Sequence, residues 1–180
     1  MNTEELLRSV LSDDVVRRTF GGVLPRDKLP KKILKDFPVS FIVNTDTGRG
    51  PGKHWVAFYL ENRHYGEFFD SYGYRPEHLA KEFGTFLSKN VENWEHNRRK
   101  LQGDFSTVCG QYCLFFLHRR CRGYDVREIA EMFRKDTDAN DLTVNRFVND
   151  AYDHNLEVLD TDYLVDQIAL PFMESLKRLT

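Results

Sequence analysis

Apolar residues recur every three or four positions at the start of the chain, behind an Asn/Thr capping signal. That spacing predicts an amphipathic helix from Asn2 to about Phe20, because residues three or four apart share one helical face. Gly21 and Gly22 are expected to end the helix, and a polar connector with prolines follows. The apolar face is formed by Leu6, Leu7, Val10, Leu11 and Val15.

The middle of the chain has the pattern of strands. Residues 39–43, 54–60 and 65–70 are short runs rich in β-branched and aromatic side chains. The last two runs flank residues 61–64, a polar segment that we expect to be the turn of a β-hairpin. Residues 44–53 are rich in Gly, Thr and Asn and are predicted to form a loop directly before His54.

Helical patterns return after the hairpin. Pro76 is predicted to start a helix, and a polar strand is expected within residues 91–101. Residues 109–120 are apolar on almost every face, which predicts a helix buried at the centre of the fold. The apolar positions of the helix that starts at Pro76 are Leu79, Phe83, Phe86 and Leu87.

Residues 125–180 are predicted to be helical. Asp125 starts one helix, with Glu128 in a capping-box position, and the last 25 residues carry an amphipathic pattern broken at Pro171. Strands in the middle of the sequence with helices on either side predict an α+β fold, in a single domain over residues 1–180. Two sets of apolar positions mark helices in this part: Ile129, Met132 and Phe133, then Val144, Phe147, Val148 and Ala151.

Composition narrows the class of protein. The chain has 180 residues and a net charge of −2, which gives no global sign of a nucleic-acid or membrane partner. Its three cysteines lack the count and spacing of a disulfide framework, and no signal peptide precedes the first helix. We therefore expect free thiols in a reducing compartment. No apolar run approaches the ~20 residues that span a bilayer.

Several motif-like segments do not fit the patterns they resemble. The segment GRGPGK (residues 48–53) has one intervening residue too few for a phosphate-binding loop. The segment DTDAND (residues 136–141) begins like a calcium loop, but Asp141 and Phe147 stand where such a loop needs Gly and Glu. We therefore predict no metal site. Four further residues have zinc-ligand chemistry without zinc-ligand spacing: Cys109, Cys113, His118 and Cys121.

His54 and Asp70 form the first half of a candidate site. With a three-residue loop at residues 61–63, the hairpin places His54 directly opposite Asp70, and a two-residue loop leaves the two adjacent. Directly opposed residues have Cβ atoms ~4.5–5.5 Å apart. A carboxylate at that distance can hold one ring nitrogen of an imidazole and stabilise its protonated form. The simpler alternative is an ordinary cross-strand charge pair.

Cys109 is the candidate nucleophile. It is predicted to lie in the first turn of the buried helix, with Ser106 or Thr107 as the cap. Unpaired N–H groups and the helix dipole stabilise a thiolate there, and a neighbouring imidazolium lowers the thiol pKa further. Cys113 lies one turn later among apolar residues and is predicted to serve packing alone.

Gln102 supplies the remaining requirement. Acyl transfer from a thiolate builds an oxyanion, which the Gln102 amide and the backbone N–H of Cys109 can stabilise by ~3 kcal/mol each. The alternative for Gln102 alone is a surface amide. Together the histidine, aspartate, glutamine and cysteine fill each role of a thiol hydrolase once.

At these residues the chain resembles the adenovirus-type processing protease family (adenain), within the larger fold of ubiquitin-like-protein proteases. The seven-residue interval from Gln102 to Cys109 is also that of the family. The resemblance runs from the first helix to residue 121 and is thin after residue 125. Three blocks carry it in order: FIVNTDTGRGPGKHW, FFDSYGYRPEHL and QGDFSTVCGQYCLFFLH.

The resemblance implies a role for each candidate residue. Cys109 is implied as the nucleophile, His54 as the base, Asp70 as the carboxylate that orients the base, and Gln102 as the oxyanion donor. The implied fold is a mixed sheet with helices on both faces and a papain-like cysteine protease site between the Cys109 helix and the hairpin. Two residues beside the base are implied as walls of the substrate cleft: Trp55 and Gly52.

The resemblance also implies a viral endopeptidase. Its substrates would be precursor capsid and core proteins, cut at glycine-containing sites during virion maturation, with the enzyme in the virion and in the host nucleus or viral factory. We expect a monomer without a membrane partner. The alternative within the same superfamily is a protease that removes SUMO or other ubiquitin-like modifiers, and a third reading is a scaffold that retains the fold without activity.

Two departures bear on cofactors. Adenoviral enzymes are basic and use DNA and a disulfide-linked activating peptide as cofactors, whereas this chain is slightly acidic and has no cysteine in the corresponding region around Val91. We therefore expect no required cofactor. Asp70 stands where adenoviral enzymes usually carry Glu, and Asp is the residue that cellular SUMO proteases use.

Overall fold

The computed structural model describes residues 1–33 and 36–153, in which five strands form one mixed sheet. The strands follow one another across the sheet in sequence order. The central pairs β2–β3 and β3–β4 are antiparallel, and the outer pairs β1–β2 and β4–β5 are parallel. The strands are β1 (Phe20–Pro25), β2 (Val39–Asn44), β3 (Trp55–Leu60), β4 (Tyr65–Phe69) and β5 (Asn93–His96).

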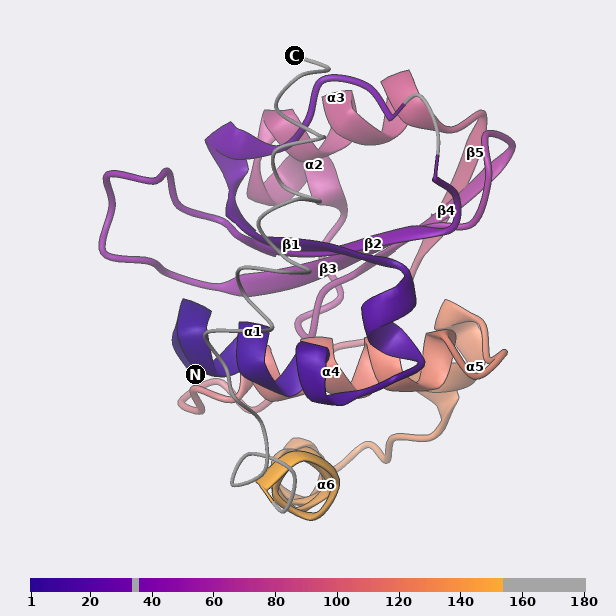
Figure 1. Ribbon diagram of the computed structural model, residues 1–180. Helices are drawn as coiled ribbons and strands as arrows, with labels where there is room; N and C mark the ends of the chain where they lie inside the picture. Colours follow the sequence, from indigo (N-terminus) through magenta and orange to yellow (C-terminus); the bar gives the residue numbers. More distant parts are fainter. Residues whose placement is uncertain (34–35, 154–180) are drawn as a thin grey trace.

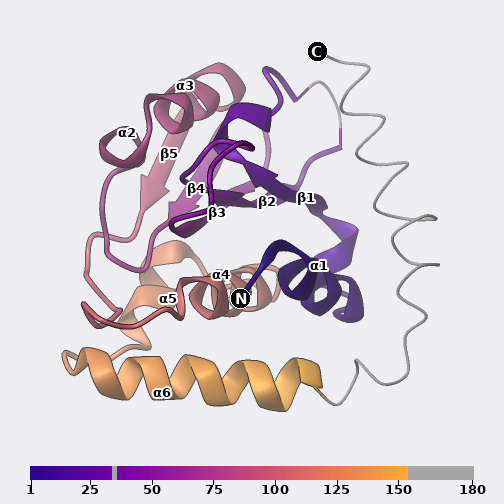
Figure 2. The same ribbon diagram turned by 90° about the vertical axis from the view of Figure 1, so that its left-hand side faces the viewer.

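Helices cover both faces of this sheet (Figure 1). Helices α2 (Pro76–Leu79) and α3 (Lys81–Asn90) lie on one face. The other face carries α1 (Thr3–Ser12), α4 (Cys109–Arg120) and α5 (Val126–Glu131), and α6 (Thr137–Val148) packs outside α4 (Figure 2). The predicted α+β class, with a central mixed sheet between helices, is confirmed. Short helical turns complete the fold at Val16–Arg18, Arg26–Lys28 and Asn149–Asp153.

The sheet separates two apolar cores. On the α3 side, the ring of Phe58 lies within 5.0–5.4 Å of the rings of Phe68, Phe83 and Phe86. On the α4 side, Phe69 stacks on Phe116, with 4.8 Å between centroids and 8° between planes. Helix α4 is buried from Tyr112 to Leu117, as its apolar pattern predicted. None of the helices in the described ranges is long and apolar enough to cross a bilayer.

The first part of the chain differs from the prediction. The first helix ends at Ser12, because Asp13 turns the chain and its carboxylate accepts the backbone N–H groups of Val15 and Val16. Gly21 and Gly22 do not end a helix but lie within β1. A Cβ atom on Gly21 would come within 2.3 Å of the Phe41 ring, so glycine allows β1 to approach β2.

Smaller corrections concern the helices. The helix expected from Pro76 is two helices, since Ala80 has extended backbone and separates α2 from α3. Met132 is exposed instead of facing the core. The polar strand expected within residues 91–101 is β5, and the capping box of Asp125 and Glu128 is present at α5. The pattern around Pro171 lies outside the described residues.

Phe58→Ala is expected to lower the free energy of unfolding by about 3–5 kcal/mol, because it leaves a cavity among three buried rings. The matched control is Phe105→Ala, which removes a fully exposed ring and should change stability by less than about 0.5 kcal/mol. Urea unfolding measures both values. Equal effects of the two substitutions would contradict this packing.

Candidate active site

A cleft of about 650 Å³ lies where the start of α4 meets the start of β3. Cys109 is the first residue of α4, and His54 directly precedes β3. Asp70 is fully buried beside the cleft and contacts His54. The structure therefore brings together all six residues that the sequence singled out, five of which line the cleft: Gly52, His54, Trp55, Gln102 and Cys109.

The hairpin places His54 and Asp70 together through a register that differs from the expected one. Ala57 pairs with Phe69, so continuing the ladder places Asp70 opposite Val56, and His54 lies diagonally across from it. The expected direct pairing was wrong by two positions. The side chains still meet, because residues two apart share a face of the sheet: His54 Nε2 is 2.5 Å from Asp70 Oδ1.

The main chain of Asp70 is held by Asn97, the residue directly after β5. The buried side chain of Asn97 accepts the Asp70 backbone N–H at 3.0 Å and donates to its carbonyl at 2.6 Å. The second carboxylate oxygen of Asp70 accepts the backbone N–H of Tyr74 at 2.8 Å. Sequence reasoning missed Asn97, since a single asparagine after a short polar strand gives no local signal of this contact.

The electrostatics of His54 favour the charged imidazole. Burial opposes a charge on the ring, but hydrogen bonds and charge interactions with Asp70 and Cys109 raise the pKa of His54 to about 9. The ring of Tyr72 also lies against His54, with 5.1 Å between centroids. Since Asp70 occupies Nε2, the other ring nitrogen, Nδ1, is left for Cys109.

The first turn of α4, which contains Cys109, has no side-chain cap. The expected cap at Ser106 or Thr107 was wrong: Val108 is the N-cap and makes no side-chain cap bond. The backbone N–H of Cys109 therefore has no intrahelical acceptor. Burial alone would raise the pKa of the Cys109 thiol, but the hydrogen bond and charge of His54 and backbone N–H donors lower it below its ordinary value. Those donors are the N–H groups of Trp55 and Gly110.

The other two cysteines lie in different environments. Cys113 is buried in the core on the α4 side, and burial raises the pKa of its thiol well above the ordinary value. Burial also raises the pKa of Cys121, whose sulfur lies 3.6 Å from the hydroxyl of Thr19. All three cysteines are free. The contrast between Cys109 and Cys113 follows their positions in α4, as the sequence indicated.

Gln102 is buried, and its side chain has a fixed orientation. Its Oε1 accepts the hydroxyl of Ser71 at 2.6 Å, and its Nε2 donates to the Ser106 carbonyl at 2.9 Å. An amide nitrogen carries two hydrogens, so a second donor remains on Nε2. Ser71, directly after Asp70, was not recognised from the sequence, although the block FFDSYGY contains it.

Trp55 and Gly52 lie where the predicted cleft walls were expected. The indole N–H of Trp55 donates to the Met1 carbonyl at 3.1 Å, which fixes the ring beside the cleft. Gly52 has φ +82°, a conformation that favours glycine, and its loop is anchored where Asn44 accepts the backbone N–H of Lys53 at 3.1 Å.

A thiol of lowered pKa, an imidazole held by a buried carboxylate and nearby amide donors form the site of a thiol-dependent hydrolase. The family model of the adenovirus endoprotease matches residues 20–131, and the chain belongs to this family. The family indicated by the sequence motifs is confirmed.

Proteins similar in sequence to this chain include viral proteases. The cysteine protease of African swine fever virus is 33% identical over 96 residues, which are 44% of this chain and 32% of the relative. The protease of bovine adenovirus 2 is 29% identical over 126 residues, 64% of this chain and 61% of the relative. The chain thus covers less than two thirds of either relative. A solved African swine fever virus protease is 24% identical with a TM-score of 0.42, covering 63% of this chain and 44% of that one.

His54→Ala is expected to slow the alkylation of Cys109 by iodoacetamide at pH 7 by about 10-fold or more, because the imidazole stabilises the thiolate. In the unchanged chain, the lowered pKa of Cys109 keeps the thiolate present below the ordinary thiol pKa of ~8.5, and reactivity falls only as the pH drops through the lowered value. Mass spectrometry of the Cys109 peptide separates it from Cys121. Identical rates with and without His54 would contradict the pairing.

Proposed function

We propose that the chain is a viral cysteine endopeptidase that cleaves precursor structural proteins during virion maturation. The observation that supports this best is the hydrogen bond of His54 with buried Asp70, beside the cleft that His54 lines together with Cys109. In this proposal Cys109 is the nucleophile and His54 is the base that becomes the general acid. Asp70 orients His54, and Gln102 is the oxyanion donor.

The chemistry follows from these positions. The Cys109 thiolate adds to the scissile carbonyl, and the carbonyl π electrons move to oxygen. The resulting oxyanion accepts the Cys109 backbone N–H and the second hydrogen of Gln102 Nε2, each donor contributing about 3 kcal/mol. The His54 imidazolium gives its proton to the leaving amine as the C–N bond breaks. Water, deprotonated by the neutral imidazole, then hydrolyses the thioester.

The substrate proposal is capsid and core precursors with glycine-containing sites, in the virion and in the host nucleus or viral factory. It is supported by viral relatives that carry the name protease and by a cleft whose wall is the chain segment from Gly48 to Gly52. Glycines in a wall let the main chain of a substrate approach closely, which suits an extended, glycine-containing segment.

We further propose that the protein is a monomer and that it works without a disulfide-linked peptide. The position nearest the expected attachment point of such a peptide is Val91, which is a buried core residue.

A second candidate is the removal of a SUMO-type modifier from tagged proteins. One observation favours it: relatives from African swine fever virus isolates, 32% identical over 96 residues, are named SUMO-1 cysteine protease. The same thiolate chemistry would serve, because such modifiers end in glycine. The two functions differ in what the surface outside the cleft must bind: only the second requires it to bind a folded modifier.

Co-expression with candidate capsid precursors, followed by mass-spectrometric mapping of new termini, tests the first function. New termini at glycine-containing sites are expected from the unchanged chain. Cys109→Ala should abolish them by lowering the rate at least about 10³-fold, whereas the matched variant Cys113→Ala should retain most activity, because Cys113 serves only packing. If both variants cleave normally, the assignment of the nucleophile is wrong.

Vinyl-sulfone probes built on SUMO and on ubiquitin separate the two functions. The maturation function predicts slow, non-selective labelling of Cys109 by either probe, because affinity for a folded modifier is absent. Rapid labelling by the SUMO probe, blocked by free SUMO, would replace the first function with the second.

A further inference from the structure

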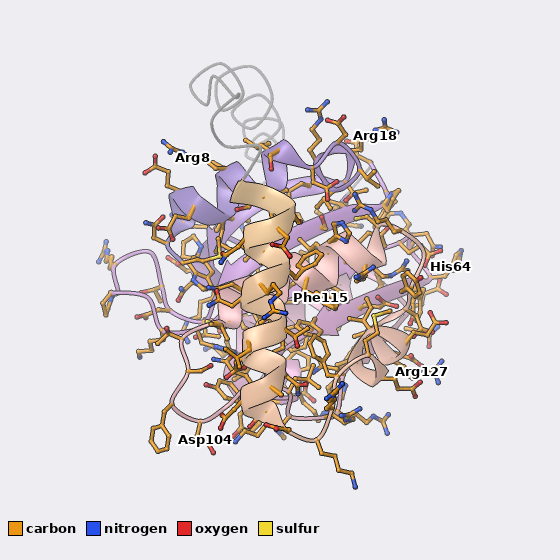
Figure 3. The ribbon with its side chains drawn as sticks, turned by 90° about the horizontal axis from the view of Figure 1, so that it is seen from below. Arg8, Arg18, His64, Asp104, Phe115 and Arg127 are labelled. Atoms are coloured by element: carbon orange, nitrogen blue, oxygen red, sulfur yellow. The ribbon has the colours of Figure 1, made fainter. Side chains whose placement is uncertain are left out.

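Helix α6 holds the main chain on both sides of Gln102. Asp141 accepts the backbone N–H of Gly103 through Oδ2 at 3.1 Å, and the buried amide of Asn140 donates to the carbonyl of Leu101 at 3.1 Å. In Figure 3, Asp104, the next residue of this loop, lies by the N-terminal end of α6. The helix lies beyond residues 20–131, which match the family model.

The same carboxylate connects the loop to the helix of the nucleophile. Tyr112, one turn after Cys109 in α4, is fully buried, and its hydroxyl lies 2.9 Å from both Asp141 Oδ1 and the Leu101 carbonyl. Burial and the bond to Asp141 raise the pKa of Tyr112, so the phenol remains a donor. The thiol helix, the Gln102 loop and α6 therefore meet at Asp141.

The loop is shaped for this contact. A Cβ atom on Gly103 would come within 2.9 Å of Asp141 Oδ2, so a larger residue at this position would push the Asp141 carboxylate away from the loop. On the other side, the backbone N–H groups of Leu101 and Gln102 donate to the Ser71 carbonyl at 2.8 and 3.1 Å. The peptide before Gln102 is thus bonded through both its carbonyl and its N–H group, and the peptide after Gln102 is bonded through the Gly103 N–H. Their placement sets where the Gln102 amide can lie.

We propose that Asp141 is a positioning residue, which holds the amide of Gln102 at the oxyanion through Gly103 and Tyr112. The proposal rests on the proposed function, because this amide matters only where Cys109 attacks a carbonyl. Oxyanion donors act only at hydrogen-bond distance, and a displacement of ~1 Å can cost ~10²-fold in rate. The carboxylate never touches the substrate and takes no part in proton transfer.

Asp141→Ala and Asp141→Asn test this, with Asp138→Asn as the matched control. Asp138 is an exposed carboxylate one turn earlier in α6, and its Oδ1 would lie 3.0 Å from a Cβ atom on Gly103. It forms no hydrogen bond with the loop in the described residues, so Asp138→Asn tests proximity to Gly103 without the hydrogen bond. We expect Asp141→Ala to lower kcat by about 10- to 100-fold with little change in KM. Asp141→Asn keeps one acceptor oxygen, so its kcat should lie between that of Asp141→Ala and that of the unchanged chain. Thermal unfolding checks that each variant folds. If the alanine variant does not fold, the asparagine variant, which has nearly the same shape as aspartate, still provides the test.

Two further measurements distinguish positioning from general damage. A Gly-Gly peptide aldehyde forms a C–S bond with the Cys109 thiolate, and its oxygen receives the carbonyl π electrons and then the His54 proton. Its affinity should fall in the Asp141 variants about as kcat does, while iodoacetamide alkylation of Cys109 stays at the unchanged rate.

Two results would contradict the proposal. Asp141 variants within about twofold of Asp138→Asn in kcat and aldehyde affinity would overturn it, and so would an equal loss of Cys109 alkylation. A failed proposed function gives a different result, since the unchanged chain would then cut no peptide. The aldehyde affinities would still decide the role of Asp141, because they require only addition to a carbonyl.

Discussion

The site depends on one buried contact, between His54 Nε2 and Asp70 Oδ1 at 2.5 Å. A fully buried carboxylate is costly unless every oxygen has a partner, so Asp70 is stable only where an imidazolium and a backbone donor meet it. His54 supplies the first, and the Tyr74 N–H supplies the second. In return, the carboxylate keeps the imidazole charged beside Cys109, and that charge maintains the thiolate.

The packing of the fold sets the distances in this site. Phe69, the residue before Asp70, stacks on Phe116 of α4, so the hairpin and the helix that carries Cys109 pack in the same hydrophobic core. Asn97, directly after β5, fixes the Asp70 main chain, and the hydroxyl of Ser71 joins the residue after Asp70 to Gln102. Nucleophile, base, carboxylate and amide come from separate segments, and buried contacts hold those segments in place.

Much of this could be predicted from the sequence. Helix α4 begins at Cys109, as expected, because its apolar run is long and unambiguous. The expected hairpin register was wrong because the turn lies one residue later than assumed. The Glu61 backbone N–H donates to the Tyr65 carbonyl, and Asn62 accepts the backbone N–H groups of His64 and Tyr65. Strand β1 was missed because Gly21 and Gly22 are typical of the end of a helix. The need for glycine at position 21 is visible only in the fold, where the Phe41 ring leaves no room for a Cβ atom. Asn97 and Asp141 act across long sequence separations, which no local pattern records.

The most direct test of the central claim is an NMR titration of the His54 ring in the unchanged chain. The contacts with Asp70 and Cys109 predict that the ring stays protonated at pH 7 and loses its proton at about pH 9. In a Cys109→Ala variant the midpoint should fall, because the neighbouring thiolate is gone, while Asp70 keeps part of the upward shift. A midpoint near the ordinary value of ~6.5 in the unchanged chain would contradict the thiolate–imidazolium pair on which this account depends.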